Sequence, residues 1–242
     1  RQINSICAGH PEYKKGSGIE TTTGPLGQGL GNSVGMAIAE SIFRKKFGSD
    51  LINNKTYVIC SDGDLMEGIS HEAMSLAGHL KLKNLIVFFD NNKISIDGST
   101  SLSVSDNYKK RFESYGWSFF EVNGHNEKQI SKAILKATKS NKPTLISCKT
   151  IIGFGSPNKS GKASSHGSPL GDDEISLVRK KLKWKNEPFS VPAAVLESWR
   201  EIGKKGAQLE EKWQHILNKK SDKIKLNLEN FVEKSEFKEL ED

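Results

Sequence analysis

Short apolar runs alternate along the chain with longer segments in which apolar residues recur at helical spacing. The apolar runs are rich in β-branched and aromatic residues, and each ends in polar or turn-forming residues, which is typical of strands. They are 56–60, 85–89, 117–122 and 144–149. Helical spacing is found at 27–47, 69–80, 108–115 and 127–140. This alternation predicts an α/β fold, with a parallel sheet flanked by helices on both faces.

The last third of the chain has a different pattern. Residues 153–171 contain five glycines and two prolines and predict a long loop, a feature that is often functional inside a domain. Helices are predicted at 172–182 and 195–217, and the last residues alternate Lys and Glu, as in a solvated linker or a terminal helix. We therefore expect a main domain over 1–190 and a helical extension over 191–242.

Length and composition narrow the class of protein. The 242 residues suit one large domain or one domain with an appendage, and 35% apolar residues are enough for a packed core. No apolar run approaches the roughly 20 residues of a membrane-spanning helix, so we expect no membrane partner. The net charge of +7 comes from lysines spread over many segments without a nucleic-acid-binding motif, so we expect no nucleic-acid partner either.

The cysteines and the first residues bear on location. Cys7, Cys60 and Cys148 are an odd number at wide spacing, which argues against a disulfide framework and a zinc site and favours a reduced, cytoplasmic setting. The chain begins without Met and shows no signal core or amphipathic leader. We therefore expect a fragment or a processed product rather than a targeted precursor.

Polar residues that could hold a metal follow two of the predicted strands. Asp62 and Gly63 come after the first strand, and Asn91 and Asn92 come after the second. Ligands of an open parallel sheet bind at the carboxyl ends of its strands, so these residues are expected to meet. Because Mg²⁺ takes carboxylate, amide and carbonyl oxygens together with phosphate oxygens, the pattern favours a diphosphate held through Mg²⁺.

This conjunction resembles the fingerprint of enzymes that bind thiamin diphosphate and Mg²⁺, with Ser61 in place of the usual first glycine. Further segments resemble transketolases and follow in the family order. They are 9–12, 20–29, 67–73, 94–98, 149–159 and 166–171. By this resemblance the main domain is similar to the diphosphate-binding domain of transketolases, and the extension would lead toward a pyrimidine-binding domain that this chain lacks.

The resemblance implies a set of cofactor ligands. Asp62, Asn92 and the carbonyl of Ile94 match the ligands of Mg²⁺, for which Ca²⁺ or Mn²⁺ can substitute. Gly63, Asn92 and His166 match diphosphate contacts. Backbone that lies against the cofactor in the family is matched by Gly24, Pro25 and Leu26.

The resemblance also implies catalytic roles and one further cofactor neighbour. His10 and His166 match histidines that reach the sugar substrate, and Glu67 matches an acidic residue that couples the two active sites across a dimer interface. Lys149 matches a position near the cofactor in some members of the family. His71, His79 and His125 match no motif and are expected to be structural or surface residues.

The implied activity is reversible transfer of a two-carbon ketol unit from a ketose phosphate to an aldose phosphate, by a transferase of the pentose phosphate pathway. In the family the pyrimidine-binding domain comes from the partner subunit of a homodimer. This chain would carry only the diphosphate and Mg²⁺ half of such a site. The isolated chain is therefore expected to be inactive.

Two alternatives remain open from the sequence. The first is another thiamin enzyme of similar layout, such as dihydroxyacetone synthase or 1-deoxyxylulose-5-phosphate synthase. The segment 67–72 and the loop 153–171 favour transketolase over the latter but separate it poorly from the former. The second alternative is a non-catalytic homologue that only binds thiamin diphosphate.

Overall fold

The computed structural model describes residues 9–234, and Cys7 lies outside this range. The described chain divides into two compact units. The first unit extends to Ala39 and resumes from Asn54 to Lys183, and the second comprises Glu40–Asn53 and the chain from Trp184 onward. The site residues that the sequence predicts all belong to the first unit.

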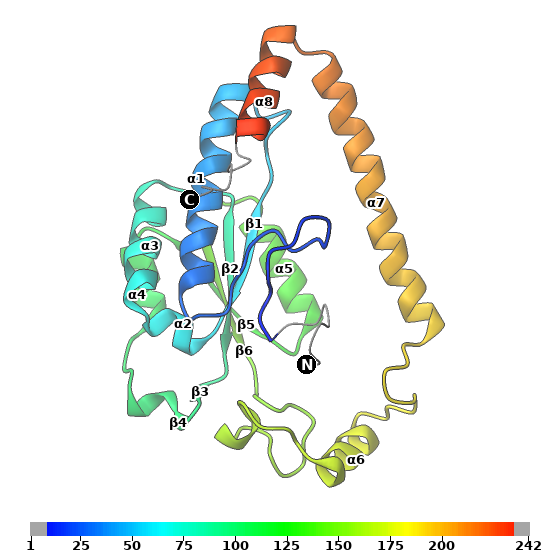
Figure 1. The fold of residues 1–242 in the computed structure, drawn as a ribbon. Coiled ribbons are helices and arrows are strands. Elements are labelled where there is room, and N and C mark those ends of the chain that lie inside the picture. The colour runs from blue at the N-terminus through cyan, green and yellow to red at the C-terminus, as the bar shows by residue number, and fades with distance from the viewer. Residues whose placement is uncertain (1–8, 235–242) are drawn as a thin grey trace, which may run out of the picture. The chain divides into compact units, whose positions relative to one another are not determined.

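The first unit is built on a four-stranded parallel sheet in the order β1-β2-β6-β5 (Figure 1). The strands are β1 (Thr56–Cys60), β2 (Leu85–Asn91), β5 (Ser118–Asn123) and β6 (Thr144–Lys149). Phe89 of β2 lies opposite Cys60 on one side and Ser147 on the other, so the strands end at one common edge of the sheet. The parallel sheet that the sequence predicts is confirmed.

The predicted helices are all present, with small differences at their ends. The helices are α1 (Gln28–Phe47), α2 (Asp62–Met66), α3 (Gly68–His79), α4 (Tyr108–Ser114), α5 (Glu127–Ala137), α6 (Asp172–Lys181), α7 (Ala193–Asn218) and α8 (Asp222–Lys234). The five-residue α2 and the hairpin of β3 (Ile94–Ser95) with β4 (Gly98–Ser99) were not predicted, because such short elements show no periodicity. None of the described helices is long and apolar enough to cross a membrane.

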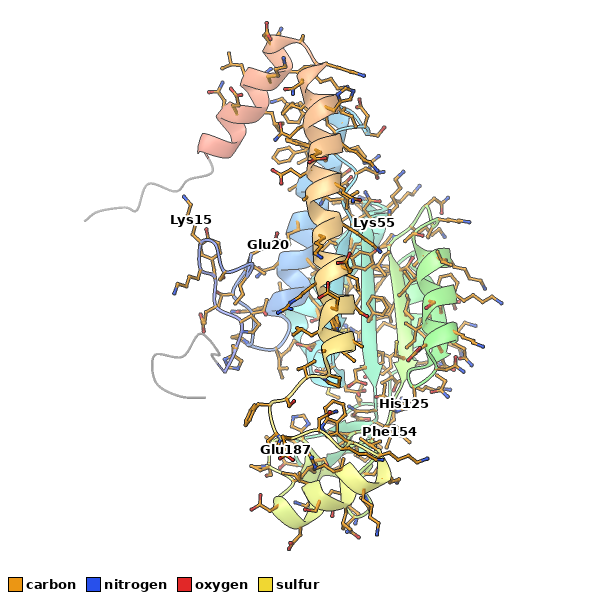
Figure 2. All side chains as sticks on the ribbon, turned by 90° about the vertical axis from the view of Figure 1, so that its right-hand side faces the viewer. Lys15, Glu20, Lys55, His125, Phe154 and Glu187 are labelled. Atoms are coloured by element: carbon orange, nitrogen blue, oxygen red, sulfur yellow. The ribbon has the colours of Figure 1, made fainter. Side chains whose placement is uncertain are left out.

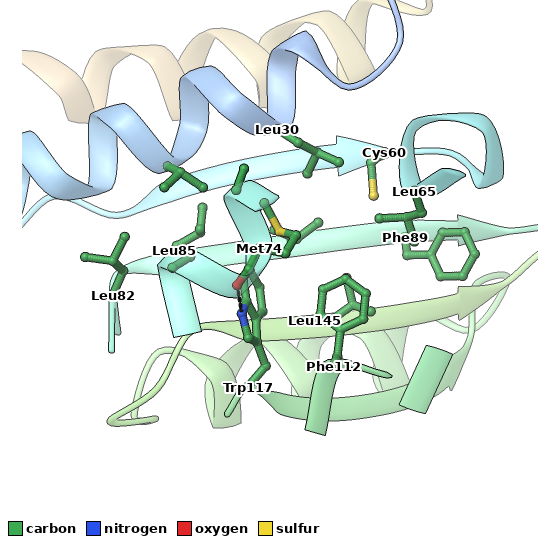
Figure 3. Close-up of a cluster of buried hydrophobic side chains, with 14 of the residues drawn as sticks. Leu30, Cys60, Leu65, Met74, Leu82, Leu85, Phe89, Phe112, Trp117 and Leu145 are labelled. Carbon is green, nitrogen blue, oxygen red and sulfur yellow. Dashed lines mark hydrogen bonds between the residues drawn. The ribbon is translucent and has the colours of Figure 1, made fainter. Parts of the chain in front are cut away.

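One face of the sheet packs against α1, α3 and α4 (Figures 1 and 3). Leu30 of α1 and Met74 of α3 are buried against Phe89 of the sheet, together with the α4 residue Phe112. The indole N–H of Trp117 donates to the Met74 carbonyl at 2.8 Å, so the polar atom of this buried ring is satisfied. This cluster anchors the helices that follow the strands.

The other face of the sheet packs against α5. Ile86 and Ile146 are fully buried there, against Ala133 and Ala137 of the helix. Ile59 of the edge strand β1 belongs to the same face but is 83% exposed. Helices therefore flank both faces, as predicted, although α5 leaves part of β1 uncovered.

The second unit has a small core of its own. Phe47 and Leu51 pack there against Leu228 of α8 and Trp213 of α7. The Trp213 indole N–H donates to the Leu51 carbonyl at 2.9 Å. Most of α7 is exposed, in line with the solvated extension that its charge pattern predicts.

Two glycines on helices of the first unit provide a test of this packing. A Cβ at Gly78 of α3 would lie 1.8 Å from the Tyr115 carbonyl oxygen, whereas a Cβ at Gly35 of α1 would meet nothing within 4 Å. We expect Gly78→Ala to destabilise the chain by about 1–3 kcal/mol or more, because backbone must move. Gly35→Ala should stabilise it by about 0.5–1 kcal/mol. Urea unfolding measures both, and equal effects would contradict the packing described.

Candidate functional site

The site lies where β1 and β2 end. Ser61 follows β1 and is the N-cap of α2: its hydroxyl accepts the Asp64 N–H, and the Asp64 carboxylate accepts the Ser61 N–H at 2.8 Å. This reciprocal capping box fixes the direction in which α2 leaves the sheet. Asp62 is the first residue of α2, and α2 contacts both β2 and the following hairpin.

Asp62 is a buried carboxylate that lacks a full set of partners. Its side chain is 1% exposed, Oδ1 accepts the Tyr108 hydroxyl at 3.4 Å, and Oδ2 has no hydrogen-bond partner among the described residues. Burial raises the pKa of Asp62, while the ammonium group and the backbone N–H of Lys93 act in the opposite direction. An unsatisfied buried carboxylate oxygen is costly unless a cation or a donor meets it.

The turn after β2 is held by its own side chains. The side-chain oxygen of Asn92 accepts the Ile94 N–H at 2.9 Å. The side-chain nitrogen of Asn92 donates to Asp90 Oδ2 at 3.2 Å. Asp90 in turn accepts the Thr150 hydroxyl. Lys93, which lies between Asn92 and Ile94 in the sequence, has a φ of 64°, in the left-handed region. The Asn92 oxygen keeps a second lone pair, so it can accept a hydrogen bond and ligate a cation together.

Neighbouring Asn91 has a different environment from Asn92. It is 7% exposed and donates to the Ser147 hydroxyl at 3.0 Å, while its own oxygen has no partner in the described part of the chain. Asn91 lines a cavity of about 470 Å³ together with Lys93, Tyr108 and Glu121. The sequence did not distinguish the two asparagines beyond the family motif, and only the strand register separates their environments.

The segment 24–27 packs directly on the start of α2. The Gly27 N–H donates to Asp64 Oδ1 at 3.0 Å, and a side chain at Gly63 would meet the Leu26 methyl group at 3.2 Å. Gly24 has φ 153°, and a Cβ there would lie 2.5 Å from the His10 ring. Two segments with predicted cofactor contacts and the predicted substrate residue His10 are therefore brought together.

Asp64 is the residue that joins these segments, and our sequence analysis did not identify it. Its Oδ1 accepts the Gly27 N–H. Its Oδ2 accepts both the N–H and the hydroxyl of Ser61, each at 2.8 Å. The sequence does carry a signal for it, because Ser-x-x-Asp before an apolar run is a capping-box pattern. The link to Gly27 spans 37 positions and leaves no local pattern.

The other predicted site residues are exposed on the first unit. Glu67 is exposed, and its Cβ lies 3.0 Å from the Cβ position of Gly27. Lys149 is opposite Asn91 in the sheet register and pairs with Glu121 at 2.7 Å. His166 is exposed in the loop before α6, and no recorded contact among the described residues joins its side chain to Asp62.

The histidines that were expected to be structural or surface residues have ordinary surroundings. His71 is hydrogen-bonded to the Tyr115 hydroxyl at 3.2 Å, and His79 is exposed in the last turn of α3. His125 accepts the Ile151 N–H at 3.0 Å and stacks on Phe154 with ring centroids 4.1 Å apart (Figure 2). His125 therefore holds the first residues of the long loop that also carries His166.

The donor set fits a hard divalent cation. Among residues 9–234 no three His, Cys, Asp or Glu side chains cluster as a metal site would require. A site of one carboxylate, one amide oxygen and one carbonyl oxygen needs no such cluster, and it is typical of Mg²⁺ completed by phosphate and water. The unpartnered Asp62 oxygen is the observation that supports this fit.

Cys60 and Cys148 are free thiols, and burial raises the pKa of both.

Known proteins resemble this chain along nearly its whole length. The family model "Transketolase, thiamine diphosphate binding domain" matches residues 1–238. Transketolase from Buchnera aphidicola subsp. Acyrthosiphon pisum is 54% identical over 218 residues, which are 88% of this chain and 33% of that protein. Transketolase from Sinorhizobium medicae is 49% identical, over 90% of this chain and 31% of that protein.

Solved structures agree with these sequence matches. Transketolase from Campylobacter jejuni superposes with a TM-score of 0.84 at 43% identity, over 87% of this chain and 33% of that one. Transketolase from Leishmania mexicana superposes with a TM-score of 0.87 at 40% identity, over 90% of this chain and 34% of that one. The chain spans about a third of the length of these relatives. It belongs to the transketolase family, in which it corresponds to the thiamine diphosphate-binding domain.

Proposed function

We propose that this chain supplies the metal- and diphosphate-binding half of a transketolase active site. The observation that carries the proposal is the buried Asp62 carboxylate, one oxygen of which has no partner, at the joint between the ends of β1 and β2. Asp62, the Asn92 oxygen and the Ile94 carbonyl would hold Mg²⁺, or Ca²⁺ or Mn²⁺ in its place. A buried anion beside two neutral oxygens suits a divalent cation that also binds phosphate.

The remaining residues would bind and orient the cofactor. Gly63 offers backbone without a side chain, and His166 would donate to the diphosphate from the long loop. Lys149 would add positive charge near the cofactor. Backbone contacts to the rest of the cofactor are assigned to Gly24, Pro25 and Leu26. They directly precede Gly27, whose N–H donates to Asp64 of α2.

Two residues are proposed to act on the sugar or on the partner subunit. His10 lies on Gly24 and would hydrogen-bond hydroxyls of a ketose phosphate near its reacting carbons, where an imidazole ring can accept or donate a proton. Thiamin diphosphate, when bound, supplies the electron sink that ketol transfer needs. Glu67 is exposed beside the site and would face the partner subunit of a homodimer.

The complete protein is proposed to be a cytoplasmic transferase that moves a two-carbon ketol unit between sugar phosphates in the pentose phosphate pathway. Its other half-site would come from a pyrimidine-binding domain of the partner subunit. We propose 1–190 as the cofactor domain and 191–242 as a helical extension. One boundary between the compact units follows Lys183, but Glu40–Asn53 belongs to the second unit. The named relatives are transketolases, so neither dihydroxyacetone synthase nor a non-catalytic binding protein is favoured.

The metal site is tested by removing its charge. Asp62→Ala and Asp62→Asn should each abolish most of the Mg²⁺-dependent affinity for thiamin diphosphate, a loss of at least about ten-fold by calorimetry, because the remaining ligands are neutral. Asp97→Asn is the matched control, since Asp97 is exposed in the neighbouring hairpin. Equal affinity with and without Mg²⁺ in the wild-type chain would contradict the proposal.

The half-site is tested by an activity assay on the 242-residue chain alone. With thiamin diphosphate, Mg²⁺, a ketose phosphate donor and an aldose phosphate acceptor, we expect weak cofactor binding and no turnover. We expect this result because the groups that activate the cofactor and bind the sugar phosphate would belong to the pyrimidine-binding domain. A full-length transketolase is the positive control, and robust ketol transfer by the chain alone would refute the half-site.

A further inference from the structure

The loop between β6 and α6 contains no strand or α-helix, only one 3₁₀ turn at Ala163–Ser165. A buried side chain of α6, Glu174 in its first turn, ties the loop to the helix. Glu174 is 7% exposed, whereas Asp172 and Asp173 of the same turn are exposed. A lone buried acid among exposed ones indicates that its carboxylate has specific partners.

The Glu174 carboxylate accepts three hydrogen bonds from one short stretch of the loop. Oε1 accepts the Ser156 hydroxyl and the Asn158 N–H, the latter at 2.9 Å, and Oε2 accepts the Asn158 side-chain amide at 2.8 Å. The Ser156 hydroxyl and the Asn158 groups lower the pKa of Glu174 to about 2. The carboxylate is therefore ionised at neutral pH, and all three bonds are charge-assisted.

From this point the hydrogen bonds continue toward His166. The Ser156 hydroxyl accepts the Lys159 N–H at 3.0 Å, and the Lys159 carbonyl accepts the Ser165 hydroxyl at 2.6 Å. The Lys159 ammonium also donates to the Leu170 carbonyl at 2.8 Å, on the far side of His166. His166 itself follows directly after Ser165, and its N–H donates to the Ala163 carbonyl at 2.8 Å.

We propose that Glu174 is a positioning residue, which holds residues 153–171 in the conformation that presents His166 and acts through Ser156, Asn158 and Lys159. This inference rests on the proposed function, in which His166 reaches the cofactor diphosphate. Glu174 does not touch the cofactor. Its effect is to keep an exposed histidine on a loop of irregular structure in one place, so that less ordering is required when the ligand binds.

The test compares Glu174→Ala with Asp173→Ala, because both changes remove one negative charge from the first turn of the same helix. Glu174→Ala should weaken Mg²⁺-dependent binding of thiamin diphosphate about ten-fold and speed hydrogen exchange at the Asn158 and Lys159 amides. Amides of β1, β2 and β6 should be unchanged, which excludes general unfolding. Asp173→Ala should do neither, and Glu174→Gln should restore part of the affinity.

A double variant tests whether the effect passes through His166. In a His166→Ala background, Glu174→Ala should cause no further loss of affinity. The same loss in both backgrounds, or faster exchange with unchanged affinity, would overturn the inference. If His166→Ala alone leaves affinity unchanged, this inference fails with the role of His166, whereas the Asp62 variants still decide the metal site.

The pH dependence of stability provides a readout besides ligand binding. The folded pKa of about 2 lies below the ordinary value of 4.5, so the stabilisation by Glu174 is fully present above about pH 4.5 and is lost as the pH falls toward 2. The difference in unfolding free energy between the wild type and Glu174→Ala should shrink over that range. A difference that is constant with pH would show that the carboxylate charge is not what holds the loop.

Discussion

The parallel pairing of β1 with β2 is the constraint on which the rest of the site depends. Because Cys60 lies opposite Phe89, the first residue of α2 and the turn after β2 leave the sheet side by side. The capping box then turns the Asp62 side chain inward, against Tyr108 and Lys93. The result is a buried anion that the folded chain leaves partly unsatisfied, at the place where a parallel sheet binds its ligands.

Three carboxylates of the first unit have different hydrogen-bond partners, and each therefore has a different role. Asp62 is buried with an oxygen to spare, which suits a metal. Asp64 has both oxygens occupied by N–H and hydroxyl donors from two segments and therefore joins them. Glu174 accepts three hydrogen bonds from one loop and fixes that loop to a helix. Of these three carboxylates, only that of Asp62 has an oxygen without a hydrogen-bond partner among the described residues.

Much of the fold and the centre of the site could be predicted from the sequence, for physical reasons. β-branched runs ending in Asp-Gly and Asn-Asn identify strands and the chemistry at their ends, and alternation with helices makes the sheet parallel. The exposed Ile59 and the five-residue α2 could not be predicted, because neither follows from a periodic pattern. The roles of Asp64 and Glu174 depend on partners 37 and 16 to 18 positions away, which only the folded backbone brings near.

Lys93 places a positive charge near the buried Asp62 carboxylate, at the site where the metal is proposed to bind. Its ammonium group opposes the burial penalty on Asp62 without a recorded hydrogen bond to the free oxygen, and its backbone is held in a conformation that costs an L-residue about 1–2 kcal/mol. A divalent ion bound to Asp62 would therefore lie in the field of a positive charge from the same turn. Repulsion between the two cations would lower the affinity of the site, and a neutral residue at position 93 would remove that repulsion.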